Sequence, residues 1–494
     1  QDDFQKIPGS PLANWVSDVT RENFSTKPSI KSTLNPKQGT STGDDEKFVR
    51  HWFEVDFCRL GLGVKSLEQA LESKFRYFPL DKGGEFRRWY GNNEKVIKFD
   101  LESYNELKGI GNHLPSKDLY FNKGITWSKI TSFKISVRFD ECGFVFSSVG
   151  LKGFPSDSNF YCSIGFMNSS VVEEYTKILS PTLSIVSGDI ERLPYVKIPD
   201  DVLAESVSKL IGGGKDDWDA YERSWDFQSP PILTAASEPT PTLNSSYTIW
   251  IAQNRAAIAE MKRLEEKNNR LFIDAYGLDD ELTPDVPLSQ ITLTVNPAYR
   301  YGSKLEEAEQ WTRFRQDTIE DLVSYATGCM MGRYSLDEPG LIYAHSGNER
   351  FDASKYSRFP ADDDGIVPLT DTEWFGDDAA NRVEEFIGVA WDKAHLEDNL
   401  AFLAANLGPK KGEGSRDTIR RYLCDKFYKD HMQTYKKRPI YWLFSSGKQK
   451  AFQCLVYLHR YNEGTLARMR RRSKAPGKTD CQTAQAAGRT QQLR

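Results

Sequence analysis

Hydrophobic and polar residues follow two different periods in the first 200 residues of the chain. Residues 131–139 place a large apolar side chain at every second position, and this alternation predicts a β-strand. Residues 15–24 and 164–179 have apolar side chains at helical spacing, and Ser180-Pro181 predicts the end of the second helix. We therefore expect region 1–200 to form a mixed α/β domain.

A connector is expected over residues 201–245. Its first part has helical spacing, and Gly212-Gly213-Gly214 predicts a turn that ends this helix. Residues 229–241 are rich in Pro, Ser and Thr, a composition that is typical of linkers. The sequence thus places the boundary between two domains in this stretch.

The rest of the chain has mainly the apolar spacing of helices. Five segments predict helices, namely residues 247–274, 306–331, 379–407, 417–435 and 448–469. They divide into a helical spacer region over 246–358 and a helical C-terminal domain over 379–470, with an acidic loop over 359–378 between them. In residues 471–494 the apolar content collapses, so we expect a disordered tail. The predicted fold class is a multidomain α+β protein, with a mixed α/β domain followed by a mostly α-helical region.

Composition narrows the class of protein. A chain of 494 residues is too long for one compact core and suggests several domains. The net charge of -5 means that a nucleic-acid partner would need a local basic surface.

The seven cysteines include no CxxC pair, which argues against structural zinc and is typical of a cytoplasmic protein. Apolar runs are too short to span a membrane. Because the chain starts with Gln1 rather than Met, we expect a piece of a longer protein.

One segment comes close to a catalytic motif. Methyl transfer to DNA adenine uses an Asn/Asp-Pro-Pro-aromatic loop that binds the flipped base. Here Asn296-Pro297-Ala298-Tyr299 has Ala298 in place of the second Pro, and no complete methyl-donor loop precedes it. A helix cap or turn is the alternative role of Asn296-Pro297, and it is the one we favour. We expect no catalytic and no cofactor-binding residue in this chain.

Metal-dependent chemistry has little support in the sequence. A nuclease site would need acidic residues and a lysine on neighbouring strands. The triplet Glu265-Glu266-Lys267 instead falls in the predicted helix 247–274, and we expect it to lie on a solvated helix face. The six histidines are scattered, without a pair at ligand spacing. We therefore expect no metal site.

Three clusters combine basic residues with aromatic residues, glycines or hydroxyl groups, and they favour contact with nucleic acid. In 81–93 a Gly-Gly turn lets the backbone approach a phosphate, and we expect Arg87 or Arg88 to lack a partner within the domain. The other clusters are 37–44 and 435–439, and a solvated surface loop is the alternative for each. The candidate DNA-binding residues are Lys37, Thr40, Ser41, Thr42, Lys82, Arg87, Arg88, Asn92, Lys436, Lys437 and Arg438.

These segments together resemble the C-terminal half of the PglX family, the adenine-specific DNA methyltransferases of BREX phage-defence systems. They are also similar to the wider group of type II methyltransferases and restriction enzymes that carry a target-recognition domain. The resemblance extends from about residue 1 to residue 469. It is carried by residues 7–11, 39–44, 82–92, 124–128, 165–169, 180–182, 188–190, 193–194, 324–334 and 438–447.

The resemblance implies a target-recognition domain at 1–200 that binds double-stranded DNA. It also implies a catalytic methyltransferase domain upstream as a partner, S-adenosylmethionine as the cofactor of the full-length parent, and other BREX components as further partners. Two alternatives stay open. The chain could be a protein-interaction scaffold of the defence complex, or a self-sufficient methyltransferase with a degenerate Asn-Pro-Ala-Tyr loop.

Overall fold

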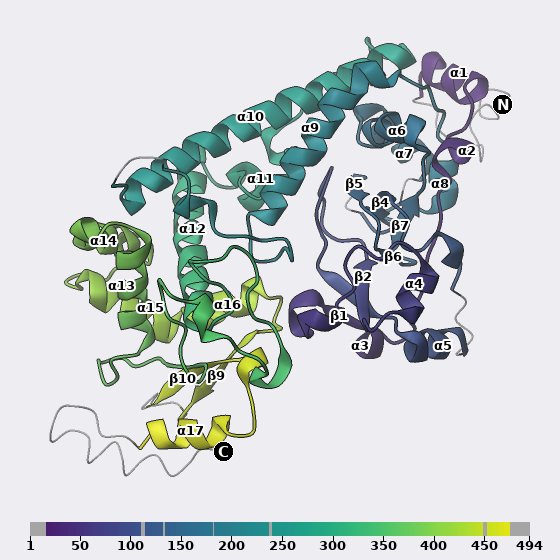
Figure 1. Cartoon of the computed structure of the whole chain (residues 1–494). Helices are drawn as coiled ribbons and strands as arrows, with labels where there is room; N and C mark the ends of the chain where they lie inside the picture. The colour runs from purple at the N-terminus through teal and green to yellow at the C-terminus, as the bar shows by residue number, and fades with distance from the viewer. Residues whose placement is uncertain are drawn as a thin grey trace. The chain divides into compact units, whose positions relative to one another are not determined.

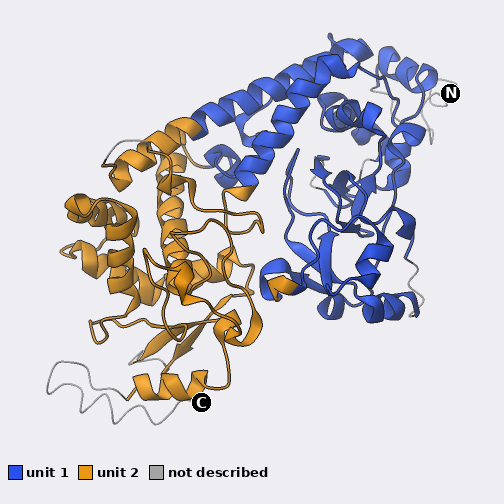
Figure 2. Cartoon of the chain, viewed as in Figure 1, with its two compact units in different colours: residues 1–55, 59–218, 254–304 blue, residues 56–58, 219–253, 305–494 orange. Residues whose placement is uncertain are grey.

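The computed structural model describes residues 16–109, 114–131, 134–180, 182–236, 240–447 and 452–474. It divides into two compact units (Figure 2). Unit 1 comprises residues 1–55, 59–218 and 254–304, and unit 2 comprises residues 56–58, 219–253 and 305–494. The predicted class of a multidomain α+β protein is confirmed, with helices and small sheets in each unit. The units are not contiguous in sequence, so this division differs from the linear series of domains that we expected.

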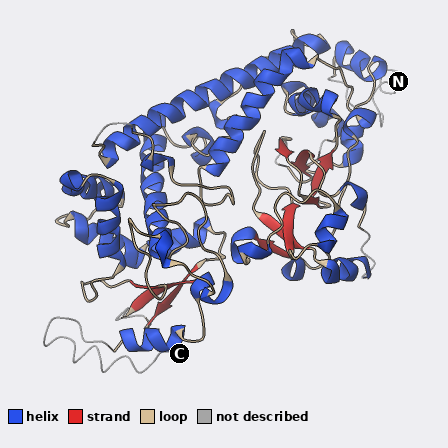
Figure 3. Cartoon of the chain, in the orientation of Figure 1, coloured by secondary structure: helices blue, strands red, loops and turns tan. Residues whose placement is uncertain are grey.

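Unit 1 contains two small sheets, drawn in red in Figure 3. The first has the order β1-β3-β2-β6, with β2 and β6 parallel and the other neighbours antiparallel. The second has the antiparallel order β5-β4-β7. The strands are β1 (Val49–His51), β2 (Tyr77–Asp81), β3 (Lys95–Lys98), β4 (Gly124–Ser128), β5 (Val137–Asp140), β6 (Val145–Phe146) and β7 (Gly150–Gly153). β5 covers only the end of the strand expected at 131–139, where residues 132–133 lie outside the described residues.

Aromatic and aliphatic side chains of the first sheet form a core with side chains from the neighbouring helices. Phe78, Ile97 and Phe146 are fully buried in this core, together with side chains from the neighbouring helices. The helices of unit 1 are α1 (Asp18–Thr26), α2 (Lys31–Leu34), α3 (Asp45–Phe48), α4 (Leu67–Glu72), α5 (Leu101–Gly109), α6 (Phe160–Met167), α7 (Ser170–Leu179), α8 (Ser187–Glu191), α9 (Asp200–Asp219) and α11 (Pro297–Tyr301). The helix expected at 164–179 is two helices, and α7 ends at Leu179 as predicted.

The three consecutive glycines do not end the helix that contains them. α9 runs through Gly212, Gly213 and Gly214, so the predicted turn is wrong. The reason is close packing. A Cβ atom on Gly213 would lie 2.9 Å from Sδ of Met261, and one on Gly214 would lie 3.4 Å from the backbone nitrogen of Tyr90. The small residues let α9 approach its neighbours at some cost in helix propensity.

The long helix α10 (Leu243–Tyr276) confirms the amphipathic segment predicted at 247–274 (Figure 1). Ile258, Met261 and Leu264 are buried along it, as their spacing indicates. Residues 243–253 of α10 belong to unit 2 and residues 254–276 to unit 1. The expected linker at 229–241 also belongs to unit 2, although residues 237–239 lie outside the described residues.

Unit 2 is mostly helical but has its own sheet, in the antiparallel order β8-β10-β9. Its strands are β8 (Ile366–Pro368), β9 (Tyr441–Ser445) and β10 (Gln453–Tyr457). Its helices are α12 (Glu307–Met330), α13 (Ala379–Ala390), α14 (Leu396–Asn406), α15 (Ser415–Asp425), α16 (Phe427–Thr434) and α17 (Thr465–Arg472). α12 confirms the helix expected at 306–331, whereas the segments 379–407 and 417–435 are each broken into two helices.

The helix expected at 448–469 is wrong. β10 is the central strand of the sheet, and all five of its residues are buried. A short apolar run of this kind fits a fully buried strand as well as a helix, so periodicity could not separate the two. Within the described part of the segment, residues 452–469, helical structure is limited to the short 3-10 turn Leu458–Arg460 and the start of α17.

Basic side chains of α17 neutralise part of the expected acidic loop at 359–378. Arg472 pairs with Asp377 at 2.7 Å and with Asp364 at 3.3 Å. The start predicted for the disordered tail, residue 471, is too early, because residues 471 and 472 belong to α17. Residues 475–494 lie outside the described residues.

Candidate functional site

Arg87 is a buried anchor of unit 1 rather than an exposed side chain. Its Nη2 atom lies 2.7 Å from Oδ2 of Asp217, on α9, and its Nε atom donates to the backbone oxygen of Tyr90 at 2.7 Å. Only 3% of Arg87 is exposed. The Asp217 carboxylate also accepts from the backbone nitrogens of Thr294 and Val295. One ion pair thus fixes three segments of unit 1.

Arg88 is buried in the same way. Its Nη1 atom lies 2.7 Å from Oε2 of Glu265 on α10, and the indole nitrogen of Trp89 donates to Oε1 of the same carboxylate at 2.8 Å. Two expectations are therefore wrong. Neither Arg87 nor Arg88 lacks a partner within its unit, and Glu265, 2% exposed, does not lie on a solvated helix face. A buried cation requires such a partner, because desolvation of an unpaired charge is costly.

The polar residues that flank these arginines are half-buried. Lys82 pairs with Asp45, at the start of α3. The side chain of Asn92 donates to the backbone oxygen of Glu85 at 2.9 Å, and Asn92 itself has a positive φ of 64°. Asn92 therefore closes the turn after Gly83-Gly84, and this hydrogen bond occupies one donor of its amide.

The cluster 37–44 packs along two strands of unit 1. Lys37 forms an isolated bridge with Lys152 of β7, and Thr40 forms one with Ser147. Thr40 is fully buried, and the hydroxyl of Thr42 donates to Asp45 at 2.5 Å. Of the candidate residues in this cluster, Ser41 is exposed and Lys37 is half-buried.

The third cluster is the most accessible of the three. Lys436, Lys437 and Arg438 are all exposed and follow Tyr435, the C-cap residue of α16. Lys436 and Lys437 have φ values of 52° and 62°, and the backbone nitrogen of Lys437 donates to Met432 at 2.7 Å. This left-handed turn closes the helix and places three cationic side chains in a row on unit 2.

The structure confirms the capping role of Asn296. Its side-chain oxygen accepts from the backbone nitrogen of Ala298 at the start of α11, and its amide donates to the backbone oxygens of Leu288 and Ile291. Asn296 is 2% exposed. The amide group that would bind a flipped adenine is thus occupied by the chain itself.

Two aspartates and a lysine form a closed cluster that periodicity did not reveal. Nζ of Lys152 lies 3.2 Å from Asp81 and 3.1 Å from Asp140. These residue types could serve a nuclease. Burial, followed by the charge of Asp140, raises the pKa of Asp81 well above its ordinary value. With side chains at most 4% exposed, the cluster is shut off from a substrate and acts as a buried polar bridge between strands.

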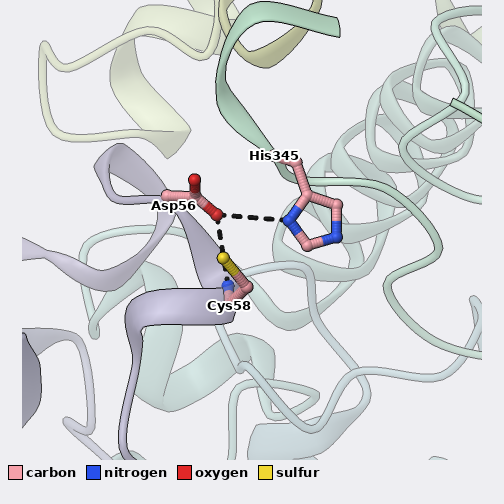
Figure 4. A group of neighbouring side chains, drawn as sticks. All are labelled: Asp56, Cys58 and His345. Atoms are coloured by element: carbon pink, nitrogen blue, oxygen red, sulfur yellow. Dashed lines mark hydrogen bonds and ion pairs between the residues drawn. The ribbon is translucent and has the colours of Figure 1, made fainter. Parts of the chain in front are cut away.

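A second missed group lies in unit 2 and contains Asp56, Cys58 and His345 (Figure 4). The ligand-type atoms of the three side chains lie within 4.8 Å of one another. His345 is 289 positions from Asp56, so no local motif could indicate it. The expectation of no metal site rested on the spacing of histidines and cysteines and on one acidic triplet, all of which are local patterns.

No family model matches the chain. Two curated relatives match 95% of it. "Adenine-specific methyltransferase BrxX" of Escherichia coli O9:H4 (strain HS) is 39% identical over 482 residues, and "Adenine-specific methyltransferase PglX" of Lacticaseibacillus casei (strain Zhang) is 36% identical over 488 residues. The chain is PglX-like. The resemblance to PglX that the motifs indicated is thereby confirmed, whereas its assignment to the C-terminal half of such a protein stays a prediction.

The PglX-like chain spans 39% of the length of the first relative and 38% of the second. Most of each relative therefore lies outside the match. Among the described residues of this PglX-like chain, no helix combines the length and apolar character that crossing a bilayer requires.

Proposed function

We propose that the chain is the DNA target-recognition part of a site-specific N6-adenine DNA methyltransferase that acts in BREX phage defence. The observation that carries this proposal is the match of 95% of the chain to two proteins named adenine-specific methyltransferases. The domain 1–200 of the sequence prediction would be its recognition domain, and double-stranded DNA would be its partner.

Catalysis belongs, in this proposal, to the part of the relatives that the chain does not match. Asn296 supports this assignment, because its amide and its oxygen are both engaged in capping α11. S-adenosylmethionine would then be the cofactor of the full-length protein, held by a catalytic domain upstream. Other BREX components would be partners of the same assembly, in the cytoplasm.

The burial of the arginines changes which residues we assign to DNA. Arg87 and Arg88 support the loop 81–93 from inside, whereas Lys436, Lys437 and Arg438 are exposed and can reach a phosphate backbone. Ser41, which is exposed, and Lys37, Lys82 and Asn92, which are half-buried, remain candidates in unit 1. The buried residues Thr40 and Thr42 act by shaping the segment 37–44. A chain with net charge -5 needs such local basic groups to attract DNA.

The test measures duplex binding and methyl transfer with the same purified chain. Fluorescence anisotropy with labelled duplexes should show binding that weakens as salt rises, and incubation with labelled S-adenosylmethionine should label no adenine. Adenine labelling by the clean chain would favour a self-sufficient methyltransferase. Absence of duplex binding, with retained binding to BREX proteins, would favour a scaffold. Either result overturns the proposal.

A further inference from the structure

Three side chains with different donor atoms converge in unit 2. Asp56 precedes the short 3-10 turn Phe57–Arg59, in which Cys58 is the middle residue, and His345 precedes a second short turn at Ser346–Asn348. Figure 4 shows the carboxylate of Asp56 between the thiol of Cys58 and the ring of His345. Oδ1 of Asp56 lies 3.2 Å from Nδ1 of His345 and accepts from the backbone nitrogen of Cys58 at 3.2 Å.

The backbone holds the two segments together independently of these side chains. The backbone nitrogen of Phe57 donates to the backbone oxygen of Ala344 at 3.0 Å. The ring of His345 packs edge-on against Tyr343, with centroids 5.4 Å apart. The two segments that carry the three donors are therefore already held together, and a ligand that bound the donors would not have to bring separate loops together.

The donor set is that of a borderline-soft divalent cation. Thiolate, imidazole and carboxylate are the usual ligands of Zn²⁺, at about 2.3, 2.0–2.1 and 2.0–2.2 Å respectively. Tetrahedral coordination at these bond lengths separates neighbouring donors by about 3.3–3.6 Å. The 3.2 Å between Asp56 and His345 and the spread of at most 4.8 Å fit this geometry after small side-chain rotations.

Access also suits a cation. The Cys58 residue is exposed, and the side chain of His345 is 40% exposed. An ion could therefore reach the three donors from solvent.

We propose that Asp56, Cys58 and His345 form a zinc site, with these three side chains as ligands and water in the fourth position. The site is independent of the proposed DNA recognition. Bound Zn²⁺ replaces the hydrogen bonds among the three side chains by metal bonds and locks residues 56–58 against His345. Binding to the folded chain alone adds to its stability by mass action.

Direct binding is the first test. Isothermal titration of the tag-free, metal-stripped chain with Zn²⁺ should give one site, and Co²⁺ should produce the visible d–d bands of a tetrahedral ion with a thiolate charge-transfer band. Cys58→Ser and His345→Gln should each weaken Zn²⁺ binding by more than the about 10- to 100-fold that removal of an outer-shell partner costs. Cys142→Ser, at a half-buried cysteine, is the matched control and should bind normally.

A second readout does not depend on affinity. Zn²⁺ should protect Cys58 of the wild-type chain from iodoacetamide and should leave labelling of Cys142 and Cys424 unchanged, as measured by peptide mass spectrometry. It should also raise the Tm of the wild type but not that of Cys58→Ser. The proposal is overturned if the wild type binds no Zn²⁺, or if binding and protection survive in either ligand variant.

Discussion

Arg88 and Glu265 lie 177 positions apart in the sequence, and their side chains form an ion pair of 2.7 Å inside unit 1. The two side chains are 7% and 3% exposed. Trp89 donates to the second oxygen of the same carboxylate, so that both oxygens are occupied. The segment that looked like a DNA-binding loop is therefore tied to α10 by a buried charge pair.

Removal of this pair should destabilise unit 1. Glu265→Gln leaves the buried Arg88 cation with only the more distant and more exposed carboxylate of Glu173, 3.9 Å away. Removal of one partner of a buried pair typically costs about 3–5 kcal/mol, and Glu173 should keep the loss at or below the lower end of that range. Urea unfolding followed by tryptophan fluorescence measures the change. The control is Glu260→Gln on the same helix, where Glu260 pairs with Arg263 on the surface and little stability depends on it. Equal effects of the two substitutions would contradict the structural role of Glu265.

The adjacent glycines of α9 should respond differently to alanine. A Cβ atom on Gly212 meets nothing within 4 Å, so Gly212→Ala should raise the free energy of unfolding by about 0.5–1 kcal/mol through helix propensity. At Gly213 the new methyl group would meet Met261 at 2.9 Å, and this clash should cancel or reverse the gain. Thermal unfolding of the two variants provides the comparison. A larger gain at Gly213 than at Gly212 would show that α9 packs differently.

His431 should make unit 2 sensitive to acid. Burial, and then the nearby Arg333 cation, lower the pKa of His431 to about 3, and its Nε2 atom accepts from the backbone nitrogens of Ile440 and Tyr441. Below the unfolded-state pKa of about 6.5 the unfolded chain binds a proton that the folded chain does not. Stability should therefore fall by up to about 1.4 kcal/mol per pH unit between pH 6.5 and 3.

The variant that isolates this effect is His431→Gln, which keeps an acceptor but does not titrate. It should be less stable than the wild type at pH 8, and the difference should shrink as the pH falls towards 4. Urea unfolding at a series of pH values checks this. Parallel pH profiles for the two proteins would exclude His431 as the source of the acid sensitivity.

The basic turn after α16 should contribute to DNA binding by charge alone. We combine Lys436→Gln, Lys437→Gln and Arg438→Gln in one triple variant. The slope of the logarithm of the duplex-binding constant against the logarithm of the salt concentration should become shallower by about 0.9 for each phosphate that is no longer neutralised. The exposed pair Lys410 and Lys411 in the same unit is the control, and its double Gln variant should bind like the wild type. An unchanged slope in the triple variant would remove this turn from the DNA surface.

Local sequence determined much of the fold. The apolar period of α10 and α12, the Asn-Pro start of α11 and the end of α7 at Leu179 all follow from interactions between residues a few positions apart. Such interactions produce a repeating pattern of residue types that can be recognised in the sequence. For the same reason the fold class was predictable.

Tertiary structure alone decided the rest. Glu265 lies on a helix face whose exposure depends on Arg88, and β10 is a strand because β8 and β9 flank it. The close approach of Met261 leaves little room for a side chain at Gly213. His345 joins Asp56 and Cys58 across 289 positions. The spacing of apolar residues predicts which face of an element is buried, but it does not predict which other segment packs against that face. The partner of a buried charge or a metal donor is therefore fixed only when distant segments pack together.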